Sequence, residues 1–316
     1  MLFKSSLKTI IIGLGGIGLD YDLKKRDRIF SHAKSVSQSK NFNLIAGIDL
    51  VKRKRRIFSK IYKKSSFSNL IYLKKKNISF DLAIISVDTD KHLKIIKQLS
   101  SFNFKYCILE KPGAKNFREL KIILNILKRK GVKILLNYPR NYFNHYNKLT
   151  KILDKDNYIV CLYSRGFKNN CSHIISLFLK LGGKLKKIKL LDSNNDKNNP
   201  NLKIDLNRYK IFFINIPLKN CSYNKIFILN KKNIAESKNN LNSIYYSASY
   251  KSKEIKANYD YYDTDSSSLI KYEPKLQKKA LEKMYSIFQS KLDYKRYYKL
   301  NYETSKILWK VQSLLK

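Results

Sequence analysis

A glycine-rich motif directly follows an apolar run near the start of the chain. The run LKTIII, residues 7–12, is followed by GLGGIG, residues 13–18, which has the spacing G-x-G-x-x-G. The first glycine permits a tight turn, the second lets backbone N–H groups approach a pyrophosphate, and the third allows close packing on the strand. A helix after such a turn faces the anion with the positive end of its dipole. Because a glycine-rich surface turn has the same letters, the context of the motif decides between the two.

An acidic residue ends the second apolar segment, which is the arrangement expected of a dinucleotide-binding fold. Residues 42–48 read FNLIAGI and are followed by Asp49. In that fold a carboxylate at the tip of the second strand binds the adenosine ribose. Asp49 follows Gly18 at a longer spacing than the usual ~20 residues, which indicates an insertion over residues 19–30 before a helix that begins near Ser31. A turn or a helix cap is the alternative role for Asp49.

The first 137 residues alternate between apolar strands and amphipathic helices. Further buried strands are predicted at residues 80–87, 106–109 and 132–136, with helical patterns between them. Such alternation is typical of a doubly wound parallel sheet. We therefore expect an α/β chain whose residues 1–137 form a Rossmann dinucleotide-binding domain.

The pattern changes after residue 137, and residues 138–316 are assigned to a second, α+β domain. Strand-like runs at 158–163, 186–191, 209–216, 225–229 and 243–250 are separated by polar turns, which predicts a mainly antiparallel sheet. Helices are expected near residues 141–153, 172–181, 274–290 and 303–315.

The charge of the chain is extreme, with 66 Lys and Arg against 23 Asp and Glu, a formal net charge of +43. A polyanion such as nucleic acid is one explanation. The lysines are spread along the whole chain, however, and the residues with A/T-rich codons are all abundant. We expect no localised basic patch with interleaved aromatics, so compositional drift is the favoured explanation and no specific nucleic acid is expected.

Cysteine usage and hydropathy favour a cytoplasmic protein without a membrane partner. Four cysteines show no C-x-x-C spacing, so reduced thiols and no metal site are expected. No run of about 18 uncharged apolar residues is present, and the N-terminus lacks the features of a signal peptide.

Four motifs in order along the chain carry a resemblance to a known family. They are the glycine motif, Glu110-Lys111-Pro112, Asn137-Tyr138-Pro139-Arg140, and Arg165-Gly166 followed by Asn170-Cys171-Ser172-His173. Together they resemble the oxidoreductases typified by glucose–fructose oxidoreductase, inositol dehydrogenase and MocA. Residues 18–22 and 31–33 resemble a subgroup associated with sugar pathways of bacterial surface polysaccharides.

The resemblance implies hydride transfer between a nicotinamide and a sugar or nucleotide sugar, with Lys111 as the acid/base and His173 as a second catalytic residue. It implies a peptide before Pro112 that is often cis, and a homodimer or homotetramer built on the open sheet face. Many members carry aspartates where this chain has Asn169 and Ser176. These departures leave open a homologue that binds NAD(P) without catalysis.

The remaining site residues follow from the same motifs. Cofactor-binding roles are assigned to Gly13, Gly15, Gly16, Ile17, Gly18, Asp49, Ser86, His92, Glu110 and Pro112. Substrate-binding roles are assigned to Arg140, Asn169 and Asn170, and for Arg140 a structural role at the domain junction is equally open. We expect His92 to cap or pack a helix start near the cofactor. Tyr21 and His32 could line the cofactor cleft, but a core or surface role is favoured for each. Asp49 favours NAD, whereas Lys52 and Arg53 leave NADP possible.

Overall fold

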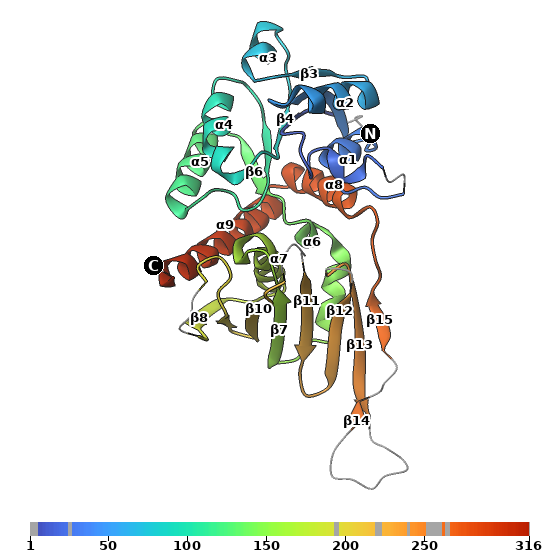
Figure 1. The fold of residues 1–316 in the computed structure, drawn as a ribbon, viewed down its shortest axis with the longest axis vertical. Helices are drawn as coiled ribbons and strands as arrows, with labels where there is room; N and C mark the ends of the chain where they lie inside the picture. The colour runs from blue at the N-terminus through green and yellow to red at the C-terminus, as the bar shows by residue number, and fades with distance from the viewer. Residues whose placement is uncertain are drawn as a thin grey trace. The chain divides into compact units, whose positions relative to one another are not determined.

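The computed structural model describes residues 6–24, 27–192, 196–218, 223–238, 241–250, 261–262 and 266–315 (Figure 1). The chain divides into two compact units that are each discontinuous in sequence. Unit 1 takes Met1–Phe143 and Pro274–Ser305, and unit 2 takes Asn144–Glu273 and Lys306–Lys316.

Unit 1 is built on a six-stranded parallel sheet with the strand order β3-β2-β1-β4-β5-β6. Its strands are β1 (Leu7–Ile12), β2 (Phe42–Ile48), β3 (Ser65–Phe67), β4 (Leu82–Ile85), β5 (Tyr106–Leu109) and β6 (Lys133–Leu136). The central strands are apolar along their length because both faces of the sheet are covered, and Ile10, Ile84 and Ile108 are fully buried. The predicted doubly wound sheet is confirmed, and its direction switches between β1 and β4.

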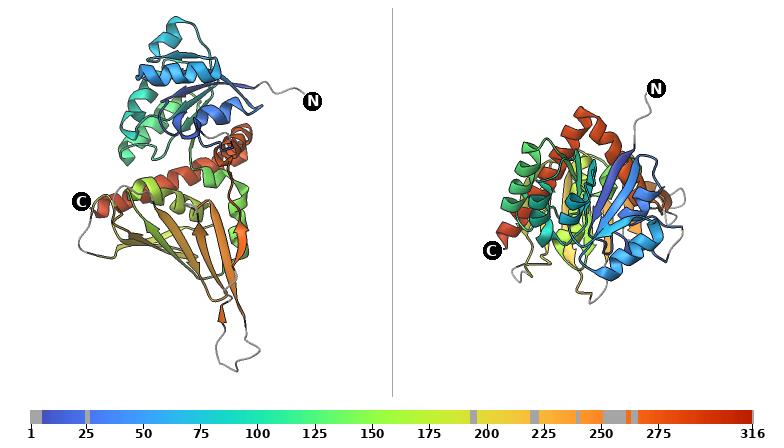
Figure 2. Two further views of the ribbon diagram at one scale, coloured as in Figure 1. Left: turned by 45° about the vertical axis from the view of Figure 1, so that its right-hand side comes forward. Right: turned by 90° about the horizontal axis from the view of Figure 1, so that it is seen from above.

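The helices of unit 1 cover both faces of this sheet. They are α1 (His32–Ser37), α2 (Lys52–Tyr62), α3 (Ile71–Lys75), α4 (His92–Leu99), α5 (Phe117–Arg129) and α6 (Pro139–Tyr142). Figure 2 shows α1 and α2 on one side of the sheet and α4 and α5 on the other. Right-handed crossovers in opposite directions from the switch point require this arrangement. It leaves the carboxyl ends of β1, β2, β4 and β5 along one edge.

Two C-terminal helices complete unit 1, α8 (Leu276–Gln289) and the first part of α9 (Lys291–Leu314). Helix α8 packs on α1 and α6. Helix α9 protects the edge strand β6, because the N–H of Ile134 donates to the Tyr294 hydroxyl at 3.1 Å and the N–H of Leu136 donates to Asn301 Oδ1 at 2.9 Å. The unpaired donors of an edge strand are thereby satisfied within the chain.

Unit 2 is built on a mainly antiparallel sheet, as predicted, with β7 and β10 forming its one parallel pair among the described strands. Its strands are β7 (Asn157–Tyr163), β8 (Leu185–Leu190), β9 (Leu202–Leu206), β10 (Tyr209–Asn215), β11 (Asn224–Leu229), β12 (Asn233–Lys238), β13 (Ser243–Tyr250), β14 (Tyr261–Tyr262) and β15 (Ser267–Ile270). Helix α7 (Phe167–Lys180) contacts β7. Buried and half-buried residues alternate along β7 and β10, as in a sheet with one covered face.

Strand pairing brings lysine and aromatic side chains together in unit 2. Side chains of its strands form four lysine–aromatic pairs, with 4.6–5.5 Å between ammonium and ring centroid. The pairs are Lys203 with Phe212, Lys210 with Tyr158, Lys225 with Phe227, and Lys238 with Tyr245. Basic and aromatic residues are therefore interleaved here, because strand pairing gathers lysines that are dispersed in sequence.

Several helix boundaries also need correction. The helix expected at 141–153 is instead α6, which ends at Tyr142, followed by a 3₁₀ segment, η3 (Asn144–Lys151), because Phe143 between them has an extended backbone. Helix α7 begins at Phe167 rather than at 172, and α9 begins at Lys291 rather than at 303.

Three further observations concern groups that the sequence analysis considered. Cys107, Cys161 and Cys171 are buried free thiols, and Cys221 lies outside the described residues. No cluster of three or more potential metal ligands is found in the described ranges. None of the helices in the described part of the chain is long and apolar enough to cross a membrane.

Candidate functional site

The glycine motif lies at the carboxyl end of β1, where the sheet changes direction. Gly13 has φ +96°, and a Cβ there would lie 2.6 Å from the carbonyl carbon of Ser86. A Cβ at Gly18 would lie 2.1 Å from the Gly13 oxygen. Packing of the protein itself therefore requires glycine at 13 and 18. A Cβ at Gly15 meets no atom within 4 Å, so nothing in the described chain accounts for the glycine there.

The backbone of residues 15–18 forms a single helical turn. The N–H of Leu19 donates to the Gly15 oxygen at 2.8 Å, but the N–H groups of residues 15–18 find no acceptor in the described chain. Helix α1 continues this turn after the insertion, because the N–H groups of His32 and Ala33 donate to the oxygens of Ile17 and Gly18 at 2.8 and 3.0 Å. The anion-facing end is therefore the glycine turn itself, rather than the first residue of α1.

The insertion before α1 is tied at both ends by acidic side chains. The buried Asp22 carboxylate, in η1 (Asp20–Asp22), accepts from the N–H groups of Phe30 and Ser31 at 2.5–2.9 Å. The Ser31 hydroxyl accepts from the N–H of Lys34 and caps α1, so the predicted helix start near Ser31 is confirmed. Asp20 pairs with Lys54 of α2.

Asp49 follows β2 and reaches back to the glycine turn. Its Oδ2 accepts from the N–H of Leu14 at 2.7 Å, and its Oδ1 accepts from the N–H of Val51 at 2.7 Å. A carboxylate oxygen has further acceptor capacity after one such bond. The open position at Gly15, the N–H groups of residues 15–18 that have no acceptor in the described chain, and this carboxylate fit the diphosphate and ribose of a dinucleotide.

Ser86 and His92 connect the neighbouring loops. Ser86, after β4, donates its hydroxyl to the Gly13 oxygen at 2.8 Å and so fixes the glycine turn. His92 is fully buried, with Nδ1 3.2 Å from the Gly113 oxygen and Nε2 3.1 Å from the Val87 oxygen. Burial lowers the pKa of His92, against the two carbonyl contacts that favour its charged form. These contacts join the loops after β4 and β5, which agrees with the expected packing role at the start of α4.

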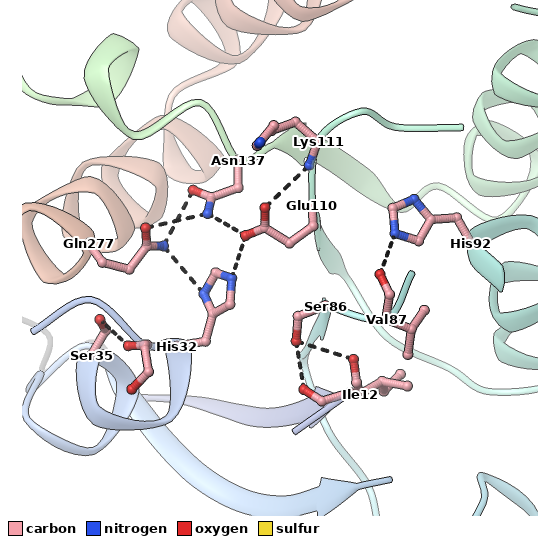
Figure 3. A network of polar contacts seen from close by, with 12 residues as sticks. Ile12, His32, Ser35, Ser86, Val87, His92, Glu110, Lys111, Asn137 and Gln277 are labelled. Carbon is pink, nitrogen blue, oxygen red and sulfur yellow. Dashed lines mark hydrogen bonds and ion pairs between the residues drawn. The ribbon is translucent and has the colours of Figure 1, made fainter. Parts of the chain in front are cut away.

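Glu110 ends β5 and is the centre of a buried polar network (Figure 3). We call His32, Glu110, Asn137 and Gln277 the Glu110 network. His32 Nε2 lies 2.7 Å and Asn137 Nδ2 lies 2.5 Å from Glu110 Oε1. Gln277 Nε2 lies 3.3 Å from His32 Nδ1 and 3.3 Å from Asn137 Oδ1. The four side chains come from α1, the ends of β5 and β6, and the first turn of α8.

Lys111 follows Glu110, and its charge state depends on this neighbourhood. Burial would raise the pKa of Glu110, but the hydrogen bonds from His32 and Asn137 and the positive charge around the carboxylate outweigh burial and lower that pKa. Burial lowers the pKa of Lys111, the Glu110 charge opposes this, and Arg140 adds to the lowering. The Lys111–Pro112 peptide is cis. A lysine whose pKa is lowered toward neutrality can exchange a proton at working pH.

Two members of the Glu110 network were not identified as site residues from sequence. His32 was expected in the core or on the surface, and it is indeed fully buried, but its bond to Glu110 crosses 78 residues of sequence. Gln277 lies 140 residues from Asn137, and a glutamine in the first turn of a helix carries no sequence signal. Only the Glu-Lys-Pro and Asn-Tyr-Pro-Arg motifs could point to this place.

Of the remaining predicted residues, Arg140 lies on α6 of unit 1, and the others lie on α7 of unit 2. Asn170 Nδ2 donates to the Ser164 oxygen. The N–H of Gly166, which has φ +94°, donates to Asn199 Oδ1 at 2.7 Å. Asn169 is exposed, whereas Ser176 is fully buried on the face of α7 that packs inward. His173 is half-buried on the same helix. The catalytic and substrate-binding roles of these residues stay predictions.

The fold and the glycine turn define a Rossmann-type dinucleotide-binding protein. Residues 7–138 match the sequence model of the oxidoreductase family with an NAD-binding Rossmann fold, GFO_IDH_MocA. The resemblance stated from the motifs is confirmed for these residues. The expected cofactor class, NAD or NADP, agrees with this family. No curated protein sequence matches the chain.

Solved structures with similar folds extend over nearly the whole chain. A UDP-N-acetylglucosamine 3-dehydrogenase from Acidithiobacillus ferrooxidans is 12% identical, with a TM-score of 0.66 over 98% of this chain and 99% of that chain. A 3-ketoreductase from Actinomadura kijaniata, solved with TDP-benzene and NADP, is 8% identical, with a TM-score of 0.71 over 96% and 95%. The WlbA dehydrogenase from Chromobacterium violaceum, solved with NADH and UDP-GlcNAcA, is 14% identical, with a TM-score of 0.60 over 77% of each chain. At these identities the likeness concerns the fold.

Proposed function

We propose that this chain is an NAD(P)-dependent dehydrogenase or reductase that transfers hydride between nicotinamide and a hydroxyl or keto group of a sugar. The observation that carries the proposal is the position of Lys111. It follows β5 at the carboxyl edge of the sheet, next to the switch point, where ligands bind in such folds. Its neighbour Glu110 is anchored by two side chains from other parts of the chain, His32 and Asn137.

In this proposal some residues of unit 1 bind the cofactor and another transfers the proton. The N–H groups of residues 15–18 would hold the diphosphate, and Asp49 would accept from the adenosine ribose. The bound nicotinamide would supply or accept the hydride. Lys111 would hold the proton of the reacting oxygen, donating it in reduction and taking it in oxidation. Its lowered pKa suits it to both directions.

We propose a nucleotide sugar as the substrate class. The similar structures include a UDP-N-acetylglucosamine dehydrogenase and proteins solved with TDP-benzene or UDP-GlcNAcA. Arg140, whose charge acts on Lys111, is the cation of unit 1 that we assign to the substrate. Asn169, Asn170 and His173 are proposed to contribute from α7 of unit 2.

The direct test is the Lys111→Ala variant, with Lys115→Ala as the control because Lys115 is exposed in the same loop. Steady-state turnover is measured on UDP- and TDP-linked sugars and their keto forms, and NADH binding by nicotinamide fluorescence. Loss of the acid/base should lower kcat by a factor of about 10² or more with little change in NADH affinity. Lys115→Ala should change neither. Wild-type turnover in Lys111→Ala would contradict the assignment.

A non-catalytic NAD(P)-binding homologue is the second candidate, and Ser176 is the observation that favours it. This serine replaces an aspartate common in the family, and its side chain is fully buried. Asn169, at the other departure, cannot exchange a proton. Such a protein would bind NADH with saturation and yet turn over none of the sugar nucleotides.

The homodimer or homotetramer stays a proposal as well. The half-buried side chains of β7, β10 and β11 alternate with the buried ones and form the face opposite the core of unit 2. Light scattering after size exclusion gives the oligomer directly.

A further inference from the structure

Three hydrogen-bond donors of this region converge on the Glu110 carboxylate. An ionised carboxylate only accepts, so both atoms that contact Glu110 Oε1 must be donors. His32 Nε2, at 2.7 Å, therefore carries a hydrogen, and the nitrogen of the Asn137 amide faces Glu110 at 2.5 Å. The Glu110 Oε2 atom accepts from the backbone N–H of Lys111 at 3.3 Å. Three donors from three positions thus hold a single buried anion.

The orientation of Asn137 fixes the protonation of His32 in turn. With its nitrogen on Glu110, Asn137 presents Oδ1 to Gln277, whose Nε2 donates across 3.3 Å. The same Gln277 Nε2 lies 3.3 Å from His32 Nδ1. An amide nitrogen does not accept, so His32 Nδ1 must be unprotonated. His32 is therefore a neutral imidazole with its hydrogen on Nε2, although it contacts an anion.

The reverse arrangement is excluded by the same contacts. If His32 were an imidazolium, Gln277 would have to turn its oxygen toward Nδ1. That oxygen would also have to face Asn137 Oδ1 at the position where Gln277 now donates, and two acceptors would be left opposed in a buried site. Leaving buried polar groups unsatisfied is destabilising. The network is thus satisfied in one protonation state.

We propose that His32, Asn137 and Gln277 lock Glu110 as an anion beside Lys111, and that His32 and Glu110 are thereby positioning residues for the proton transfer by Lys111. This inference rests on the proposed function of Lys111. The Glu110 charge favours the ammonium form of Lys111, whereas burial and Arg140 disfavour it. If Glu110 stays ionised, its contribution to the pKa of Lys111 is constant. A neutral, donating His32 keeps Glu110 ionised without cancelling its charge.

The groups whose fields reach this pair lie on several elements of unit 1. Arg140 on α6 acts on Lys111, and His32 on α1 faces Glu110 directly. Glu110 also acts on His92 of α4. Helix α8 contributes Gln277, which does not titrate. Burial lowers the pKa of His92, and Glu110 and Arg140 are the charged side chains that act on Lys111.

The protonation of His32 can be measured without substrate. Long-range ¹H–¹⁵N spectra of the whole chain resolve both ring nitrogens of its four histidines, and His32→Gln identifies the His32 signals. The expected result at neutral pH is a neutral ring with hydrogen on Nε2. In Gln277→Glu, which places an acceptor opposite Nδ1, the ring should become an imidazolium. An imidazolium or an Nδ1–H tautomer in the wild type would overturn the proposal.

The effect on Lys111 can also be measured without turnover. Competitive acetylation across pH, read by peptide mass spectrometry, gives the titration midpoint of the Lys111 amine, with exposed Lys94 as an internal standard. Glu110→Gln should lower the midpoint of Lys111 by about one pH unit or more. His32→Leu should also lower the midpoint of Lys111. His32→Gln, which keeps a donor for Glu110, should give a midpoint close to that of the wild type. Unchanged midpoints in Glu110→Gln and His32→Leu would overturn the proposal.

The outcomes separate this inference from the proposed function. If Lys111→Ala keeps full turnover, the proposed function fails while the His32 spectra still report on the network. If Lys111→Ala is inactive but the midpoint of Lys111 ignores Glu110 and His32, the function stands and the inference fails. NADH binding and thermal unfolding of each variant show whether it is folded. Glu110→Gln preserves the shape of the side chain, so it remains informative if His32→Leu unfolds.

Discussion

At the scale of single residues, neighbours in sequence have different roles in the candidate site. Glu110 points into the Glu110 network and is held there by His32 and Asn137. Lys111, one residue later, carries the proposed proton transfer. The glycines divide in the same way, because Gly13 and Gly18 are required by packing, whereas Gly15 is required by nothing in the described chain. We therefore assign Gly15 to the ligand.

The Gly15→Ala variant tests that assignment. The methyl group meets no protein atom within 4 Å, so stability should be unchanged or rise by ~0.4–1 kcal/mol through the unfolded state. The same methyl should intrude on the diphosphate and weaken NADH binding by a factor of about ten or more, or ~1.4 kcal/mol. Thermal unfolding and fluorescence titration measure the two effects. Gly18→Ala should instead unfold the protein, and unaltered NADH affinity in Gly15→Ala would remove the turn from the site.

At the scale of elements, the core strands of unit 1 were predictable and the polar ones of unit 2 were not. Strands β4, β5 and β6 are continuous apolar runs because both sides are covered. Strand β12 reads NIAESK, since its outer face is polar, and it was missed together with β9 and β15. The start of α9 was missed for a related reason. Its buried side uses Tyr297 and Asn301 rather than aliphatic residues, which hides the helical period.

The cover that α9 provides for the edge strand β6 leads to a prediction for stability. Tyr294→Phe removes the oxygen that accepts from the N–H of Ile134. The unpaired donor should lower the free energy of unfolding by ~1–3 kcal/mol. Denaturant unfolding measures the change, and Tyr298→Phe is the matched control, because that hydroxyl on the same helix accepts no strand N–H. Equal stability of Tyr294→Phe and the control would show that water satisfies the edge strand.

At the scale of the whole molecule, each unit is built from segments that are far apart in the sequence. The motifs identified the candidate site, yet Gln277 enters unit 1 from a segment that returns after unit 2. No local pattern encodes that return, so the Glu110 network could not be assembled from sequence. The net charge of +43 follows directly from the composition. The lysine–aromatic pairs of unit 2 depend on strand register and could not be predicted in this way.

The central claim is that the glycine turn and Asp49 form a dinucleotide site. Titration of the purified protein with NADH and with NADPH, followed by nicotinamide fluorescence at moderate salt, tests it most directly. Moderate salt is needed because the cationic surface attracts anions without specificity. The account predicts saturable binding with NADH tighter than NADPH, since the Asp49 carboxylate repels a 2′-phosphate. Absence of saturable binding of either nucleotide would contradict it.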